Sequence, residues 1–123
     1  MKFMCIAYEE EALFHDMPPE DWQALRQQTL DYVQFLLDNQ RLITAHPLQS
    51  ATTAATVRVR DGKTAITDGP FAETKEQIGG FFLIEAADFD EALKIAEKWP
   101  SAQLGTIEVR PIEEELRTER RYG

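Results

Sequence analysis

Apolar positions along the chain alternate between short runs and helical repeats. The run 2–8 is too short to show a helical period and predicts a buried strand. A helix is predicted from Pro18 to about Asn39, because proline and acids suit its first turn and apolar residues then recur at helical spacing. Residues 9–17 are expected to be an acidic loop. The predicted apolar face of the helix comprises Trp22, Leu25, Thr29, Val33, Leu36 and Leu37.

The middle of the chain predicts three strands around a tight turn. Residues 41–47 form one strand, followed by a loop over 48–54. Residues 56–60 and 63–67 flank Asp61-Gly62, which is a strong signal for a two-residue hairpin turn.

The last third predicts a strand, a helix and a strand. Residues 79–85 follow a polar connection and carry apolar side chains toward both faces of a sheet. Asp88 is expected to cap a helix, with Glu91 as its capping-box partner. The predicted apolar face of this helix comprises Phe89, Leu93, Ala96 and Trp99. Residues 106–110 alternate as a final strand, and 113–123 form a charged tail.

The predicted order is β-α-β, a hairpin, and β-α-β within a single domain over 1–123. Two such halves favour an α+β fold, a ferredoxin-like split βαβ sandwich with an extra hairpin. Both helices then cover one face of an antiparallel sheet and leave the other face bare. Because a bare apolar face of that size is unusual in a monomer, we expect it to be buried against a second copy.

Charge and composition narrow the partners. The 123 residues carry 22 acids and 13 bases, a formal net charge of −9. Such a chain repels nucleic acid and anionic membranes on average, so neither is expected as a partner. A lone cysteine, Cys5, excludes an internal disulfide and fits a reducing compartment, so we expect a cytoplasmic protein. No apolar run approaches the roughly 20 residues of a spanning helix.

The run Thr67-Asp68-Gly69-Pro70-Phe71-Ala72-Glu73-Thr74-Lys75-Glu76 resembles the signature of the DGPF (DGPFAETKE) family, within the YCII-related proteins. The resemblance extends in order over most of the chain and implies a ferredoxin-like fold paired into a dimeric α/β barrel. Most members are uncharacterised bacterial proteins, often encoded beside extracytoplasmic-function sigma factors. Some distant relatives are enzymes with a His–Asp pair, but the matching histidine position falls here near Gln28 or Thr29. That chemistry is therefore not transferred.

Asp68 and His46 are the candidate catalytic residues. Asp68 ends a strand before a Gly-Pro turn, where a carboxylate could act as a general base. Its alternative role is structural, accepting backbone N–H bonds from the turn. His46 lies at a strand end before Pro47 and could act as a base, although an exposed imidazole is the commoner finding.

The candidate ligand-binding residues are Tyr8, Phe71, Glu73 and Lys75. Glu73 and Lys75 could contact a polar ligand or be solvated loop charges, and Phe71 could contact the ligand or anchor its loop in the core. The chain has no phosphate loop, dinucleotide fingerprint or zinc spacing, so no cofactor or metal is expected.

Two hypotheses for the function follow. The first is a homodimeric protein that binds a small polar ligand and that could be an enzyme of the cofactor-free lyase or isomerase type. Its cavity would lie between the sheet and the first helix, with Asp68, His46 and Tyr8 as polar groups. The alternative is a non-catalytic interaction or regulatory module associated with a sigma factor, using the hairpin and the charged tail as contact surfaces. A closed pocket with convergent polar groups favours the first hypothesis.

Overall fold

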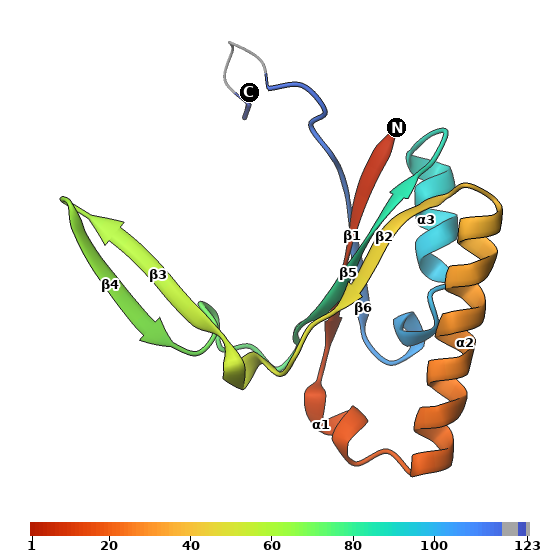
Figure 1. Cartoon of the computed structure of the whole chain (residues 1–123), viewed down its shortest axis with the longest axis horizontal. Coiled ribbons are helices and arrows are strands. Elements are labelled where there is room, and N and C mark those ends of the chain that lie inside the picture. Colours follow the sequence, from red (N-terminus) through yellow and green to blue (C-terminus); the bar gives the residue numbers. More distant parts are fainter. Residues whose placement is uncertain (117–120, 123) are drawn as a thin grey trace.

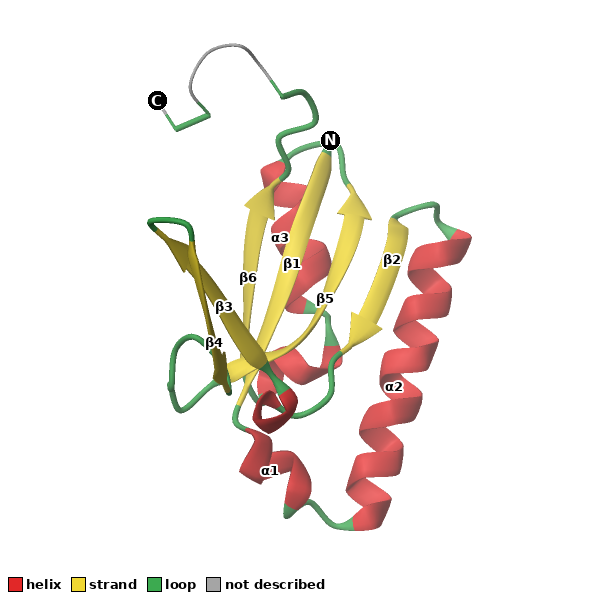
Figure 2. Ribbon diagram, turned by 60° about the vertical axis from the view of Figure 1, so that its left-hand side comes forward, coloured by secondary structure: helices red, strands yellow, loops and turns green. Residues whose placement is uncertain are grey.

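A four-stranded antiparallel sheet forms the body of this computed structural model, which describes residues 1–116, 121 and 122. Its strands, in the spatial order β2-β5-β1-β6, are β1 (Lys2–Glu9), β2 (Leu42–Pro47), β5 (Gln77–Glu85) and β6 (Thr106–Pro111). Helices α2 (Pro19–Asp38) and α3 (Phe89–Glu97) lie on one face of it (Figures 1 and 2). The predicted α+β class is confirmed, and the element order agrees with a ferredoxin-like arrangement. Part of the predicted charged tail, 117–120 and 123, lies outside the described residues.

The predicted hairpin is present, but it stands apart from the main sheet. Strands β3 (Ala55–Arg60) and β4 (Lys63–Asp68) pair only with each other in a two-stranded sheet, which we call the arm. Asp61 and Gly62 both have positive φ, 52° and 74°, as a two-residue turn of type I′ requires. Figure 1 shows the arm leaving the sheet on the side opposite to the helices.

The core lies between the sheet and the two helices. Phe3, Cys5, Leu36, Phe82 and Ile84 are at most 1% exposed. The Phe82 ring stacks on Trp99 with centroids 4.0 Å apart. The predicted burial of Leu36 and Phe82 is therefore confirmed, while Trp99 is partly buried at the edge of the same cluster. Each of the large side chains contributes about 1.5–3 kcal/mol by its transfer from water.

Helix α3 begins as its sequence predicts. The Glu91 backbone N–H donates to Asp88 Oδ1 at 2.8 Å, and Glu91 Oε1 accepts from the Ala87 N–H at 3.1 Å. The predicted apolar face is wrong at Phe89 and Leu93, which are both exposed, because Ala92, Ile95 and Ala96 form the stripe that faces the sheet.

Two further predictions about the first helical region are wrong. The expected loop over 9–17 contains a short helix, α1 (Glu11–His15), which is too brief to have a detectable apolar period. On α2, Trp22 and Leu37 are exposed. The first turns of α2 extend beyond the strands (Figure 2), and Leu37 points away from the sheet-facing position of Leu36.

Two short 3-10 helices complete the described chain, η1 (Ala51–Thr53) and η2 (Pro100–Gln103). Within the described residues, no helix combines the length and the apolar character needed to cross a bilayer.

Candidate functional site

An open pocket of about 580 Å³ lies where the main sheet ends and the arm begins. We call it the base pocket. Tyr8 of β1 and Ile78 of β5 form its sheet side, and the segments 48–54 and 70–77 supply its other walls. Its volume falls within the roughly 300–1,000 Å³ typical of small-molecule sites.

The loop 70–77 is held in place by one glutamine. Gln77 Nε2 donates to the carbonyl oxygens of Ala72 and Thr74, each at 2.9 Å. The loop starts at Gly69, whose φ of 98° favours glycine and whose N–H donates to the Ala54 carbonyl at 2.7 Å. These bonds fix the two segments that border the base pocket relative to each other.

Three consecutive acids, from the last residue of β1 to the first of α1, each lie against a different segment of the chain. Glu11 Oε2 accepts from the Ala51 N–H at 2.9 Å, and Glu10 lies 3.8 Å from Lys75 Nζ. Glu9 occupies the space that a Cβ at Gly79 would fill. These contacts could not be predicted from the sequence, since all three partners lie far along the chain. Glu11 is therefore attached to the segment 48–54 and Glu10 to the loop 70–77, the two segments that wall the base pocket.

The environments of Glu9 and Glu11 shift their pKa values in opposite directions. Burial, followed by the nearby charge of Glu11, raises the pKa of the Glu9 carboxyl. Hydrogen bonds from Ser50 and the Ala51 backbone lower the pKa of Glu11. The native state therefore favours the neutral form of Glu9 and the charged form of Glu11.

Glu9→Gln and Glu11→Gln are expected to change thermal stability at pH 7 with opposite signs. Because the pKa of Glu9 is raised on folding, the stability of the wild type falls as the pH rises from the unfolded-state pKa through the folded-state pKa. Glu9→Gln has no charge to bury, so it should melt at a higher temperature than wild type at pH 7. A lowered pKa means that Glu11 stabilises above its ordinary pKa, so Glu11→Gln should melt lower.

Melting curves at pH 7 and at about pH 3 check this, because both differences should shrink as the carboxyls become protonated. A shift of the same sign for both variants at pH 7 would contradict the assignment.

Of the sequence-predicted site residues, Tyr8 and Phe71 meet in the base pocket. Phe71 is 77% exposed, so the alternative that it anchors the loop in the core is wrong. The Arg58 guanidinium lies 5.6 Å from the centroid of its ring, within range of a cation–π contact. An aromatic surface with a neighbouring positive charge therefore borders the base pocket.

The other predicted site residues lie outside the lining of the base pocket. Asp68 ends β4 opposite Ala55, is exposed, and makes no side-chain hydrogen bond to the described residues. His46 is on β2, with Nε2 2.7 Å from Thr44 Oγ1 and its ring 5.7 Å from that of Phe81. Glu73 is exposed, and Lys75 is paired with Glu10. The structure therefore does not bring Asp68, His46 and Tyr8 into one cavity.

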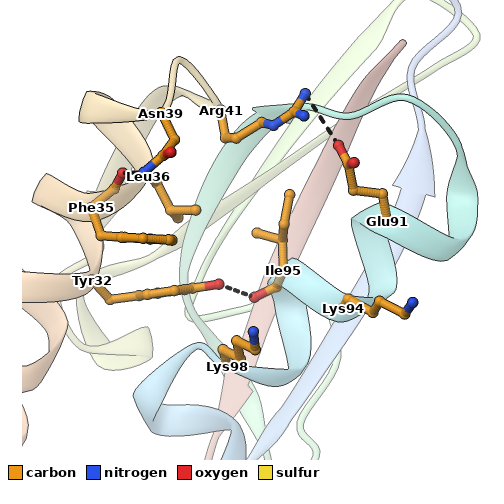
Figure 3. Close-up of a pocket in the computed structure, with 9 residues that line it drawn as sticks. All are labelled: Tyr32, Phe35, Leu36, Asn39, Arg41, Glu91, Lys94, Ile95 and Lys98. Carbon is orange, nitrogen blue, oxygen red and sulfur yellow. Dashed lines mark hydrogen bonds and ion pairs between the residues drawn. The ribbon is translucent and has the colours of Figure 1, made fainter.

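A second, smaller hollow of about 190 Å³ separates α2 from α3 (Figure 3). Tyr32 Oη donates to the Ile95 carbonyl across it at 2.7 Å, and Arg41 pairs with Glu91 at 3.1 Å. Burial is the main cause that raises the pKa of Tyr32 to about 12. The polar groups of this hollow are therefore already paired with each other, and these contacts hold α2 and α3 together. The base pocket remains the candidate site.

The described residues contain no cluster of three His, Cys, Asp or Glu side chains suited to a metal ion. Cys5 is fully buried, and burial raises the pKa of its thiol to about 12. A thiol in that setting is not a nucleophile.

Comparison with known proteins gives three findings. The family described as the YCII-related domain matches residues 1–116. An uncharacterised protein of Rhizobium meliloti (strain 1021) is 51% identical over 67 residues, 53% of this chain and 54% of that protein, so the match spans about half of the curated relative. A solved 5-chloro-2-hydroxyhydroquinone dehydrochlorinase from Burkholderia phenoliruptrix AC1100, in complex with 2,5-dihydroxybenzoquinone, is similar in fold. Its TM-score is 0.50 at 17% identity, over 94% of this chain and 96% of that one.

Proposed function

Because this chain belongs to the YCII-related domain family, we propose that it binds a small organic ligand in the base pocket. The observation that carries this proposal is the combination of groups around a space of about 580 Å³. Tyr8 offers a hydroxyl from the sheet, Phe71 offers an exposed ring from the loop, and Gln49 and Glu76 add polar groups. An apolar pocket with a few convergent polar groups is the usual form of a small-molecule site.

The lining favours a flat ring with oxygen substituents. The Phe71 ring provides a stacking surface, and Arg58 beside it favours electron-rich or anionic oxygens. The Tyr8 hydroxyl makes no hydrogen bond to the described residues, so it is available to such a substituent. The fold neighbour is described in complex with 2,5-dihydroxybenzoquinone, which makes that quinone a suitable first probe.

Catalysis of a cofactor-free lyase or isomerase reaction is the enzymatic form of this proposal. In it Asp68 and His46 would move protons, and Glu73 and Lys75 would contact polar parts of the substrate. All four lie outside the lining of the base pocket, so the ligand-binding function is the better supported form.

Membership of the DGPF group, homodimerisation and a cytoplasmic location are further parts of the proposal. The run 67–76 supports the first, since its residues resemble the signature of that group. Met4, Ile6, Phe81 and Leu83 support the second, since they are half-buried on the sheet face away from α2 and α3. The lone buried Cys5 fits a reducing compartment.

Binding of 2,5-dihydroxybenzoquinone, followed by calorimetry and by NMR, tests the proposed site. Phe71→Ala should weaken the affinity about tenfold, since loss of an aromatic contact costs about 1 kcal/mol or more. Phe35→Ala is the matched control, because Phe35 is also an exposed aromatic residue but lies on α2. The proposal fails if neither this quinone nor a panel of small hydroxylated aromatics binds saturably, or if both variants bind like wild type.

Asp68→Asn is expected to leave the free energy of unfolding within about 0.5 kcal/mol of wild type, because its exposed side chain makes no hydrogen bond to the described residues. Quinone affinity should also be unchanged, since Asp68 does not line the base pocket. Chemical unfolding and calorimetry on the same preparation measure both. A loss of about tenfold or more in ligand response with unchanged stability would instead identify Asp68 as a functional carboxylate.

The arm favours the second candidate function, an interaction or regulatory module associated with a sigma factor. Apolar Val57 and Ile66 and cationic Arg58 and Arg60 are all exposed on it, as on a protein contact surface. Co-elution of purified protein and sigma factor, abolished by charge reversal at Arg58 and Arg60, would support this function. Quinone binding without co-elution would exclude it.

A further inference from the structure

Among the described residues, the lining of the base pocket contains one charged side chain. This residue is Glu76, which is half-buried near the end of the loop 70–77. It lies two residues before Ile78, which pairs with Tyr8 where β5 begins and β1 ends. Glu76 and Tyr8 therefore belong to the part of the pocket beside the main sheet, which we call the sheet end. A carboxylate there only accepts hydrogen bonds, whereas the hydroxyl both donates and accepts them.

The part of the base pocket beside the arm, which we call the arm end, has the opposite charge. Phe71 lies at the start of the loop 70–77 and lines the pocket there. The Arg58 guanidinium of β3 is 5.6 Å from the centroid of the Phe71 ring. Arg58 is not itself a lining residue, so it borders the pocket through this ring. A planar ligand that stacks on Phe71 therefore presents one edge to a guanidinium.

The positive charge at the arm end is not neutralised by the described residues. Arg58 forms no ion pair with any of them. Alternation along the two strands places Arg60 and Lys63 on the same face of the arm as Arg58, and Asp68 on the other face. This face is a local exception to the net charge of −9. It therefore attracts an anion over the short distances at which salt does not screen charges.

We propose that the base pocket selects small aromatic rings that carry a carboxylate on one side and a hydroxyl on the opposite side. This rests on the proposed function and names the class of ligand for that same pocket. The ring stacks on Phe71, its carboxylate faces Arg58 at the arm end, and its hydroxyl donates to Glu76 at the sheet end. Arg58 and Glu76 are then the specificity-determining residues, the first for the negative charge and the second for the O–H donor.

The same arrangement discriminates against close analogues. A methoxyl in place of the hydroxyl leaves the Glu76 carboxylate without a donor. A neutral amide in place of the carboxylate loses the charge-assisted contact with Arg58. A second carboxylate on the ring, or a ligand bound the other way round, brings two negative charges together at the sheet end. Unlike charges at the two ends of the pocket therefore fix both the class of ligand and its orientation.

Calorimetry on the wild-type full chain tests the ligand class without a variant. 4-Hydroxybenzoate should bind about tenfold more tightly than 4-hydroxybenzamide, which lacks the charge. It should also bind about tenfold more tightly than 4-methoxybenzoate, which lacks the O–H donor. The preference over the amide should shrink in about 0.5 M salt, because an exposed guanidinium is screened, whereas the preference over the methyl ether should persist.

One pair of variants assigns the preference for the negative charge. Arg58→Gln should reduce the preference for 4-hydroxybenzoate over its amide to about twofold or less, and leave the preference over the methyl ether unchanged. Arg60→Gln is the matched control, because Arg60 lies on the same face of the arm but beside the turn, opposite Lys63. It should bind all three compounds like wild type.

A second pair of variants assigns the preference for the O–H donor. Glu76→Gln should abolish the preference over the methyl ether, because a side-chain amide can donate to an ether oxygen and a carboxylate cannot. It should retain the preference over the amide. Glu73→Gln is the matched control, because Glu73 is an exposed acid of the same loop that does not line the base pocket.

The outcomes separate this inference from the proposed function. Equal affinities of the wild type for the three compounds, or preferences that persist in Arg58→Gln and Glu76→Gln, overturn the ligand class alone. Preferences that fall equally in the control variants overturn the assignment to Arg58 and Glu76. Phe71→Ala should weaken binding of 4-hydroxybenzoate about tenfold, and unchanged binding would place this ligand elsewhere and overturn the inference. If neither these compounds nor 2,5-dihydroxybenzoquinone binds saturably, the proposed function fails as well.

Discussion

Replacement of Phe82 by alanine is expected to lower the free energy of unfolding by about 3–5 kcal/mol. Phe82 is 1% exposed, and its ring stacks on Trp99 at 4.0 Å with an interplanar angle of 12°. The substitution removes the apolar contact and leaves a cavity between the sheet and η2, which close packing cannot refill without strain. Urea unfolding at one fixed protein concentration measures the loss, since dimerisation would couple stability to concentration.

Phe35→Ala provides the control for the same change of side chain. Phe35 is 57% exposed on α2 and stacks only on Tyr32, at 6.1 Å. Its replacement should cost no more than about 1 kcal/mol. Equal losses for the two variants would contradict the assignment of Phe82 to the core.

Gly105→Ala is expected to cost about 3 kcal/mol, the upper end of the usual range for overpacking. A Cβ at Gly105 would overlap the carbonyl oxygen of Tyr8 and come within 3.4 Å of Glu9 Cα. Both obstacles are backbone atoms of β1, so no rotation of a side chain relieves the clash. The start of β6 would have to move away from β1 beside the base pocket. Thermal and urea unfolding measure the cost.

Gly62→Ala is the matched glycine control. Nothing lies within 4 Å of the position that its Cβ would take, and the only penalty arises from its φ of 74°. That strain costs about 1–2 kcal/mol in the left-handed region. A loss at Gly62 that equals or exceeds the loss at Gly105 would show that close approach to β1 does not restrict Gly105.

Elements with local backbone chemistry could be predicted from the sequence. The Asp61-Gly62 turn and the cap formed by Asp88 and Glu91 depend on residues within a few positions of each other, and both are present. Detachment of the arm could not be predicted, because alternation in 56–60 indicates a two-faced strand without saying which surface covers the apolar face. That choice depends on contacts between distant segments.

The site shows the same division. Residue type and position predict Tyr8 and Phe71 as ligand-binding residues, and both line the base pocket in the fold. Glu9, Glu10 and Glu11 lie against Gly79, Lys75 and Ala51 respectively. Each partner is 40 or more positions further along the chain. Three adjacent acids read along the sequence resemble a solvated run. Only the fold shows that each one lies against a different distant segment.

Burial of the lone cysteine also makes this protein convenient for site-directed labelling. Cys5 is fully buried in β1, and its raised pKa keeps the thiol protonated at neutral pH. A thiol reagent should therefore modify Cys5 of the native wild type only as fast as the sheet opens. The modification rate then measures the rate of global unfolding. For the same reason, a cysteine introduced at the exposed turn of the arm could be labelled with a fluorophore or spin label while Cys5 stays unmodified. The label would then report the motion of the arm alone.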